Sequence, residues 1–130
     1  MCRLITLVVL MVALAAGADA AGLHGTVCTH NASAREAEIC LQHALSDAQA
    51  ELKRKYEAVA ALFGTKDRKE ELARSQKTWG LYVAQTCDGL IKPETVESRL
   101  ARADVLSCRT ELTIERTNDL DRMFYVALHD

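Results

Sequence analysis

Cysteine is the residue type in this sequence whose chemistry is easiest to define. Beyond Cys2, near the N-terminus, the chain has four cysteines, at Cys28, Cys40, Cys87 and Cys108. Thiolates can bind zinc, act as nucleophiles or pair in disulfides. An even number of cysteines in a short chain predicts a disulfide framework when the chain is exported. We therefore expect two disulfides, provided that the rest of the sequence indicates export.

No other pattern indicates a metal site or a catalytic site. Cys28-Thr29-His30 and Cys40-x-x-His43 are looser than the paired ligands of zinc sites. The serines lack a G-x-S-x-G setting, and the sequence has no phosphate loop and no C-x-x-C-H haem motif. We expect no catalytic residue, no metal and no cofactor, and hence a protein that is not an enzyme.

Residues 1–20 have the pattern of a secretory signal peptide. Arg3 gives a positive start, the apolar run ITLVVLMVALAA follows, and Ala18-Asp19-Ala20 is a small-x-small cleavage site. We expect cleavage after Ala20, which leaves residues 21–130 as one periplasmic or secreted domain without a membrane span. The net charge of −2 is too small to suggest binding to nucleic acid.

Apolar residues then recur at steps of three and four, which predicts amphipathic helices. Ser33 and Glu36 form a capping box, so the first helix is expected over 33–63. Gly64 and a polar turn separate it from a second helix over 67–89.

Pro93 suits the first turn of a third helix, over 93–128, with Ser107-Cys108 as the place where it would bend or break. Its expected apolar face comprises Val96, Leu100, Ala103, Leu106, Leu112, Leu120, Met123 and Ala127. Short loops between three helices favour antiparallel neighbours. The predicted fold is all-α, a small disulfide-linked three-helix bundle with up-down-up order.

The positions of the cysteines along these helices limit their pairing. A helix rises about 1.5 Å per residue, and bridged Cα atoms lie within about 7 Å. Cys108 would lie about 22 Å along an unbroken third helix, so a bond from Cys87 to Cys108 looks difficult. We favour Cys28–Cys87 with Cys40–Cys108. Cys28–Cys108 with Cys40–Cys87 ranks next, and Cys28–Cys40 with Cys87–Cys108 ranks last.

Four stretches of the chain resemble the blocks of one protein family. They are CTHNASAREAEIC, AQAELKRKYEAVAALF, ELARSQKTWGLYVAQTC and CRTELTIERTNDL. In this order they resemble the LprI-type lysozyme-inhibitor family of exported bacterial helical domains. The motif positions that match, besides the cysteines, include Leu52, Tyr56, Gln76, Trp79, Thr113 and Arg116. Lys53 and Val83 depart from the family pattern, which commonly has Asn and Arg at these positions.

The resemblance implies an exported helical protein that inhibits lysozyme. Lysozyme cleaves glycan with two carboxylates in a cleft, so a protruding segment with cations could occlude that cleft. Lys66 and Arg68, in the turn between the first two helices, are therefore candidate residues for binding a lysozyme or another cell-wall hydrolase. The alternative is a non-enzymatic envelope module that binds another protein or forms a homodimer through the apolar end of the third helix.

Gln76 and Arg116 are polar residues on otherwise apolar helix faces. Buried polar groups need partners, so we expect these two to bond each other, Thr113 or a helix-end carbonyl beneath Trp79. The alternative is a ligand site within the bundle. Gly80, inside the second helix, costs about 1 kcal/mol relative to alanine unless another backbone packs closely there.

Overall fold

The computed structural model of the protein describes Cys28, residues 33–90 and residues 98–129. These residues are helical almost throughout and form no strand. The elements in chain order are α2 (Ala34–Leu62), α3 (Lys66–Val83), the π-helix η2 (Ala84–Asp88), α4 (Ser98–Met123) and α5 (Tyr125–His129). The predicted all-α class is confirmed. The expected signal peptide and Pro93 lie outside the described residues.

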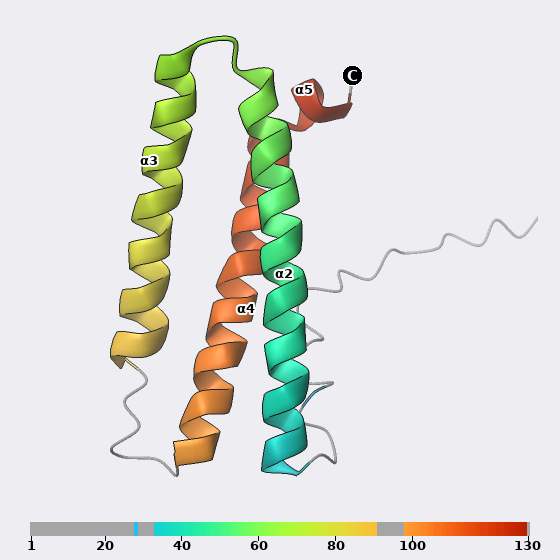
Figure 1. Ribbon diagram of the computed structural model, residues 1–130, viewed down its shortest axis with the longest axis vertical. Coiled ribbons are helices and arrows are strands. Elements are labelled where there is room, and N and C mark those ends of the chain that lie inside the picture. The colour runs from blue at the N-terminus through green and yellow to red at the C-terminus, as the bar shows by residue number, and fades with distance from the viewer. Residues whose placement is uncertain (1–27, 29–32, 91–97, 130) are drawn as a thin grey trace, which may run out of the picture.

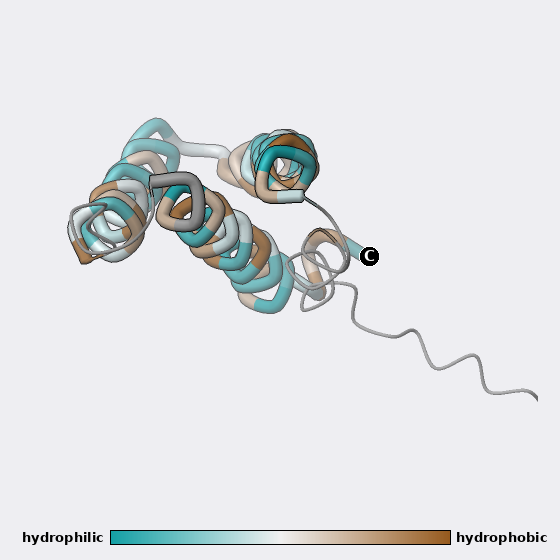
Figure 2. Tube along the Cα trace, turned by 90° about the horizontal axis from the view of Figure 1, so that it is seen from below, coloured by the Kyte–Doolittle hydropathy of each residue, from teal (hydrophilic) through white to brown (hydrophobic). Residues whose placement is uncertain are grey.

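The three long helices run up, down and up, so α2 and α4 are parallel and α3 is antiparallel to both (Figure 1). Contacts between α2 and α4 extend along their length, whereas α3 stands further from both. Seen along α2, the other two long helices are inclined to it (Figure 2). The fold is thus a tight α2–α4 pair with α3 beside it and the short α5 at one end. The predicted up-down-up order is present, but the described helices do not form a clear three-helix bundle.

Helix α2 begins where its capping box predicts. The Glu36 backbone N–H donates to Ser33 Oγ at 3.3 Å, and the Ser33 N–H donates to the Glu36 carboxylate at 2.9 Å. This exchange satisfies two donors that the first turn would leave without partners. The buried residues of α2 fall on one face, as the periodicity predicts: Ala37, Leu41, Leu45, Ala48, Leu52 and Val59.

The buried face of α4 is made largely of threonines. Its buried residues are Ala101, Thr110, Thr113, Thr117 and Leu120. Each threonine hydroxyl donates to the carbonyl four residues earlier, at 2.7 to 3.0 Å, so its polar atom is satisfied and its methyl group can pack. These short side chains let α2 and α4 approach closely. The prediction of a larger apolar face is wrong for Met123, which is 59% exposed, and for Ala127, which is also exposed. Helix α4 has no break at Ser107-Cys108. The predicted third helix is instead interrupted at Phe124, between α4 and α5.

Two ion pairs connect α2 and α4. Arg102 Nε donates to Glu38 Oε1 at 3.1 Å near the start of both helices. Lys55 Nζ donates to Asp121 Oδ1 near the other end, and the Lys55 side chain is only 17% exposed. Both partners of the second pair lie later in their helices than the partners of the first pair, as parallel helices require.

The four cysteines form two disulfides, as predicted, but the preferred pairing is wrong. Cys28 bonds Cys40, with Cα atoms 5.5 Å apart, and Cys87 bonds Cys108, with Cα atoms 5.7 Å apart. This is the pairing that the sequence analysis ranked last. Neither Cys28–Cys87 with Cys40–Cys108 nor Cys28–Cys108 with Cys40–Cys87 occurs.

The error came from the assumption that α3 ends where α4 begins. Figure 1 shows α4 beginning well beyond the end of α3, at the lower end of the molecule. Cys108 lies ten residues after Ser98, the first residue of α4, and is therefore level with Cys87. Residues 91–97, which connect the two helices, lie outside the described residues.

Removal of the second disulfide should loosen α3. The bond spans 21 residues of sequence, a separation for which loop-closure entropy predicts a stabilisation of about 3 kcal/mol. We expect the double variant Cys87→Ala/Cys108→Ala to lose about 3 kcal/mol in the free energy of unfolding, measured by urea titration. A loss below about 1 kcal/mol would show that the remaining contacts of α3 suffice without the crosslink.

Stability should fall in acid. Hydrogen bonds from Ser33 lower the pKa of Glu36, and the hydrogen bond from Lys55 lowers the pKa of Asp121. A carboxyl group whose pKa is lower in the folded chain than in the unfolded chain stabilises the fold at pH values above the unfolded pKa of about 4. This stabilisation is lost as the pH falls through the pKa of the folded chain. The urea midpoint should therefore decrease between about pH 6 and pH 2. Asp121→Asn should show a smaller decrease, and an equal decrease would exclude a contribution from Asp121.

Candidate functional site

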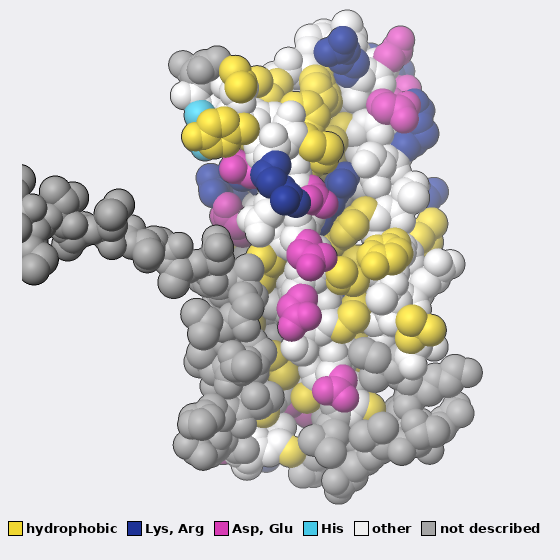
Figure 3. Space-filling view, turned by 180° about the vertical axis from the view of Figure 1, so that it is seen from behind, with side chains coloured by type: hydrophobic (Ala, Val, Ile, Leu, Met, Phe, Trp, Pro, Cys, Tyr) yellow, Lys and Arg dark blue, Asp and Glu magenta, His cyan; other side chains and the backbone are white. Residues whose placement is uncertain are grey.

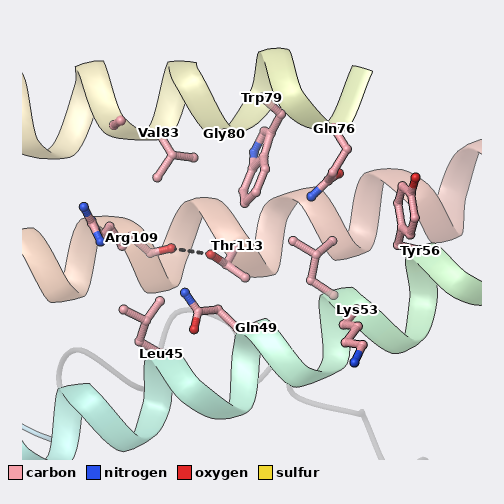
Figure 4. A pocket seen from close by; sticks show the side chains of 12 residues that line it. Leu45, Gln49, Lys53, Tyr56, Gln76, Trp79, Gly80, Val83, Arg109 and Thr113 are labelled. Carbon is pink, nitrogen blue, oxygen red and sulfur yellow. Dashed lines mark hydrogen bonds between the residues drawn. The ribbon is translucent and has the colours of Figure 1, made fainter. Parts of the chain in front are cut away.

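Residues of helices α2, α3 and α4 line an open groove of about 430 Å³. Its walls come from α2 and α3, and α4 forms its floor (Figure 4). The lining residues are Leu45, Gln49, Leu52, Lys53, Tyr56, Gln76, Trp79, Gly80, Val83, Ala84, Arg109 and Thr113. Its volume lies within the range typical of small-molecule sites.

Most residues of the predicted motif meet at this groove. Five line it directly, namely Leu52, Tyr56, Gln76, Trp79 and Thr113, and Arg116 bonds one of them. The two residues that depart from the family pattern, Lys53 and Val83, line it as well. The blocks are far apart in sequence and on three different helices, so only the folded chain brings these side chains together.

Gln76 and Arg116 connect α3 to α4 at one end of the groove. Arg116 Nε donates to Gln76 Oε1 at 3.2 Å, and an Arg116 terminal nitrogen donates to Ser75 Oγ at 2.9 Å. This confirms that the two predicted polar residues satisfy each other. Both are half-buried. Trp79 lies one turn further along α3 and packs against the core of Leu52, Val59, Leu72 and Leu120.

Helix α3 is fixed firmly at its two ends. Near its start, Leu72 is the one buried residue of the helix and packs in the core with Leu120. Beyond its end, the buried Cys87 is bonded to Cys108. The Asp88 carboxylate accepts two hydrogen bonds from Arg109 next to this disulfide, one of them at 2.9 Å. The groove lies between these two attachments.

The charged residues that line the groove are both cations. Lys53 and Arg109 line it, and no Asp or Glu does. Asp88 pairs with Arg109 and raises the pKa of its guanidinium. The Lys53 side chain is 77% exposed and lies 3.9 Å from a Glu57 oxygen, a distance at the limit of an ion pair. The Lys53 charge is therefore the one more available to a ligand.

Gly80 leaves open space in the wall of the groove. An added Cβ at this position would meet nothing within 4 Å, so no backbone packs closely there. Close packing of another backbone, which would explain a glycine inside a helix, is therefore absent. Gly80 lines the groove instead, and a larger side chain would project into it.

Lys66 and Arg68 lie away from this groove, at the end of the molecule where α2 turns into α3. The turn is shorter than predicted, because α3 already begins at Lys66. The Lys66 side chain is 87% exposed and pairs with Glu70 at 3.5 Å. Arg68 is exposed and, within the described part of the chain, forms no ion pair.

Arg68 also borders a second groove, of about 360 Å³, between α3 and the end of α4. Apolar residues dominate its lining, which includes Phe63, Leu72, Leu120, Met123 and Phe124. On the face opposite to that of Figure 1, hydrophobic side chains at the upper end lie among both cations and acidic side chains, and a further group lies midway down the molecule (Figure 3). The tip thus combines an unpaired cation with exposed apolar surface.

The described residues contain no group of three His, Cys, Asp or Glu side chains placed to hold a metal ion. Among the same residues, no helix is both long enough and apolar enough to cross a membrane.

Sequence reasoning missed several residues of the groove. Gln49 and Arg109 carry no motif signal, because only the packing of the helices turns them toward α3. Gly80 did carry a signal, since a glycine inside a helix is costly without a reason. The cost is visible in the sequence, but the open space beside Gly80 appears only in the structure.

Comparison with protein-family models matches residues 28–120 to the family described as "Lysozyme inhibitor LprI". The match covers most of the chain and includes all four cysteines of the two disulfides. Neither the curated proteins nor the solved structures gave a match.

Alanine at position 80 should stabilise the fold. Gly80 lies inside α3, and the added Cβ would meet nothing within 4 Å. Alanine restricts the unfolded chain without straining the helix, so Gly80→Ala should raise the free energy of unfolding by about 0.5–1 kcal/mol. Urea titration checks this value, and a loss of stability would show that the wall of the groove is closed at this position.

Proposed function

This chain belongs to the LprI lysozyme-inhibitor family, and we propose that it binds a lysozyme or another cell-wall hydrolase and occludes its cleft. The observation that carries the proposal is the family match over residues 28–120, which spans α2, α3 and most of α4. An inhibitor acts by binding, so this function requires a rigid complementary surface and no catalytic group. The protein is accordingly proposed to be a binding protein and not an enzyme.

The proposed location is the periplasm or the medium, where lysozymes act on cell walls. Two disulfides support this location, because they form and persist in oxidising compartments and are rare in the cytosol. The expected signal peptide, residues 1–20, would direct the chain there and leave residues 21–130 as the inhibitor domain.

The α2–α3 tip is the proposed contact with the enzyme. It stands at one end of the two helices, where a narrow structure can enter a cleft (Figure 1). Lys66 and Arg68 would face the two carboxylates by which lysozyme cleaves glycan. Arg68 is the better candidate of the two, because Lys66 is already paired with Glu70. Exposed Met123 and half-buried Phe63 nearby would supply the apolar part of the contact, since Arg, Met and aromatic residues are enriched in interfaces.

Loss of the two cations should weaken inhibition. We expect Lys66→Ala/Arg68→Ala to need at least about tenfold more protein for half-inhibition of cell-wall lysis, because even one lost charge contact of about 1.4 kcal/mol has this effect. The measurement is a turbidity assay with oxidised residues 21–130 and several types of lysozyme.

Lys77→Ala is the matched control, because Lys77 is an exposed cation on the same helix, away from the tip. It should inhibit like the unchanged protein. If the double variant also inhibits normally, the tip is not the contact. If the unchanged protein inhibits no type of lysozyme, the proposed function itself is wrong.

A second candidate function is a non-enzymatic envelope module that binds another protein or a second copy of itself. The observation in its favour is the exposed apolar surface at the end of α4 and in α5, where Tyr125 is 57% and Val126 is 69% exposed. Soluble monomers rarely expose continuous apolar patches without a partner. Light scattering on the oxidised protein, with Val126→Asp as the variant, would distinguish a dimer from a monomer.

A further inference from the structure

We propose that the groove between α2, α3 and α4 binds a small amphipathic anion, an apolar chain or ring that carries one carboxylate. This site is distinct from the α2–α3 tip, and the proposal does not depend on inhibition of lysozyme. Three properties of the groove carry it: its apolar lining, its lack of acidic groups and the space that Gly80 leaves open.

The interior of the groove suits an apolar body. Leu45 and Leu52 are 9% and 6% exposed, and Val83 and Trp79 are half-buried on the facing wall. Figure 4 shows Trp79 projecting from α3 toward α4, with Leu45 on the opposite side. Ligand sites typically combine such apolar walls with a few polar groups that fix orientation.

The groove offers polar groups of both kinds, since Gln49 and Tyr56 can each donate and accept hydrogen bonds. Gln76 Oε1 already accepts from Arg116, so its amide N–H groups remain for a ligand. The Thr113 hydroxyl donates within its own helix to the Arg109 carbonyl, so toward a ligand it can only accept. Lys53 adds an ammonium group, which has donors and no acceptor. The charged groups of the lining are both cations, so an anionic end such as a carboxylate is favoured over a cationic one.

The position of the anionic end follows from the two cations. Lys53 and Arg109 lie at opposite ends of the groove (Figure 4). Arg109 is held by two hydrogen bonds to Asp88, which neutralises it. Lys53 is mostly exposed and only weakly paired with Glu57, so its long side chain can turn to meet an anion. The carboxylate is therefore placed at the Lys53 end of the groove, where the ammonium, which points away from α3 in Figure 4, would turn inward.

The groove is ready-made, and its shape depends on a costly residue. Leu72 and the Cys87–Cys108 bond fix α3 on either side of the groove. Gly80 destabilises α3, yet nothing fills the space above it. A binding site accounts for a glycine at this position, because any side chain there would occupy room that the ligand needs.

The experiment uses the intrinsic fluorescence of Trp79, the single tryptophan of the chain, which lines the groove. Oxidised protein is titrated with dodecanoate and, separately, with dodecyltrimethylammonium, both below their micelle concentrations. The two probes share one apolar chain and differ in the sign of their charge. We expect a saturable change with dodecanoate and at least about tenfold weaker binding of the cation.

Two variants test the site itself. Gly80→Leu should abolish dodecanoate binding while urea titration shows an unfolding midpoint no lower than that of the unchanged protein. Lys53→Glu should weaken binding about tenfold or more. The matched controls are Thr78→Leu and Lys77→Glu, which make similar changes at exposed positions of α3 outside the groove, and both should bind normally.

Three results would overturn the proposal. They are no saturable change with dodecanoate, equal binding of the two probes, and unchanged dodecanoate affinity in folded Gly80→Leu. If a polypeptide perturbs Trp79 while neither probe does so, the groove is a protein-docking surface and the amphipathic anion is excluded. Inhibition of lysozyme by Gly80→Leu is measured in parallel, so failure of this proposal and failure of the proposed function remain distinguishable.

Discussion

The structure depends on how α3 is attached to the α2–α4 pair. Helix α3 buries little surface of its own, since Leu72 is its single buried residue. The Cys87–Cys108 disulfide and the Asp88–Arg109 ion pair hold its far end. The contact of Leu72 lies between the α2–α3 tip and the groove, and the disulfide with its neighbouring ion pair lies beyond the other end of the groove.

The helices could be predicted because their signals are local. The Ser33–Glu36 capping box and the spacing of apolar residues in α2 are properties of neighbouring residues, and the structure follows them closely. The pairing of the cysteines depends on how far α4 is displaced along α3, and no local pattern records this displacement. The threonine face of α4 was missed for a related reason. A threonine looks polar in sequence, and it becomes a packing residue only after its hydroxyl bonds the preceding turn.

The sequence identified several residues of the candidate site, but it did not indicate that they form one groove. The sequence motif named Gln76, Trp79 and Arg116 as structural residues, and the bond between Gln76 and Arg116 supports that interpretation. The same residues nevertheless border the groove, so a structural role and a place in a binding site coincide. Lys66 and Arg68 were chosen from their position in a turn, and the structure distinguishes them by their ion pairing, which no sequence pattern shows.

The cysteine connectivity also bears on how the chain can mature. Each bond joins two cysteines that are consecutive in the sequence, Cys28 with Cys40 and Cys87 with Cys108. A polypeptide threaded N-terminus first into an oxidising compartment would present the members of each pair in succession. An oxidase that joins thiols in the order of their arrival would thus produce the native set directly. Maturation should then require little help from a disulfide isomerase, because the loop closed by one native bond contains no cysteine of the other bond.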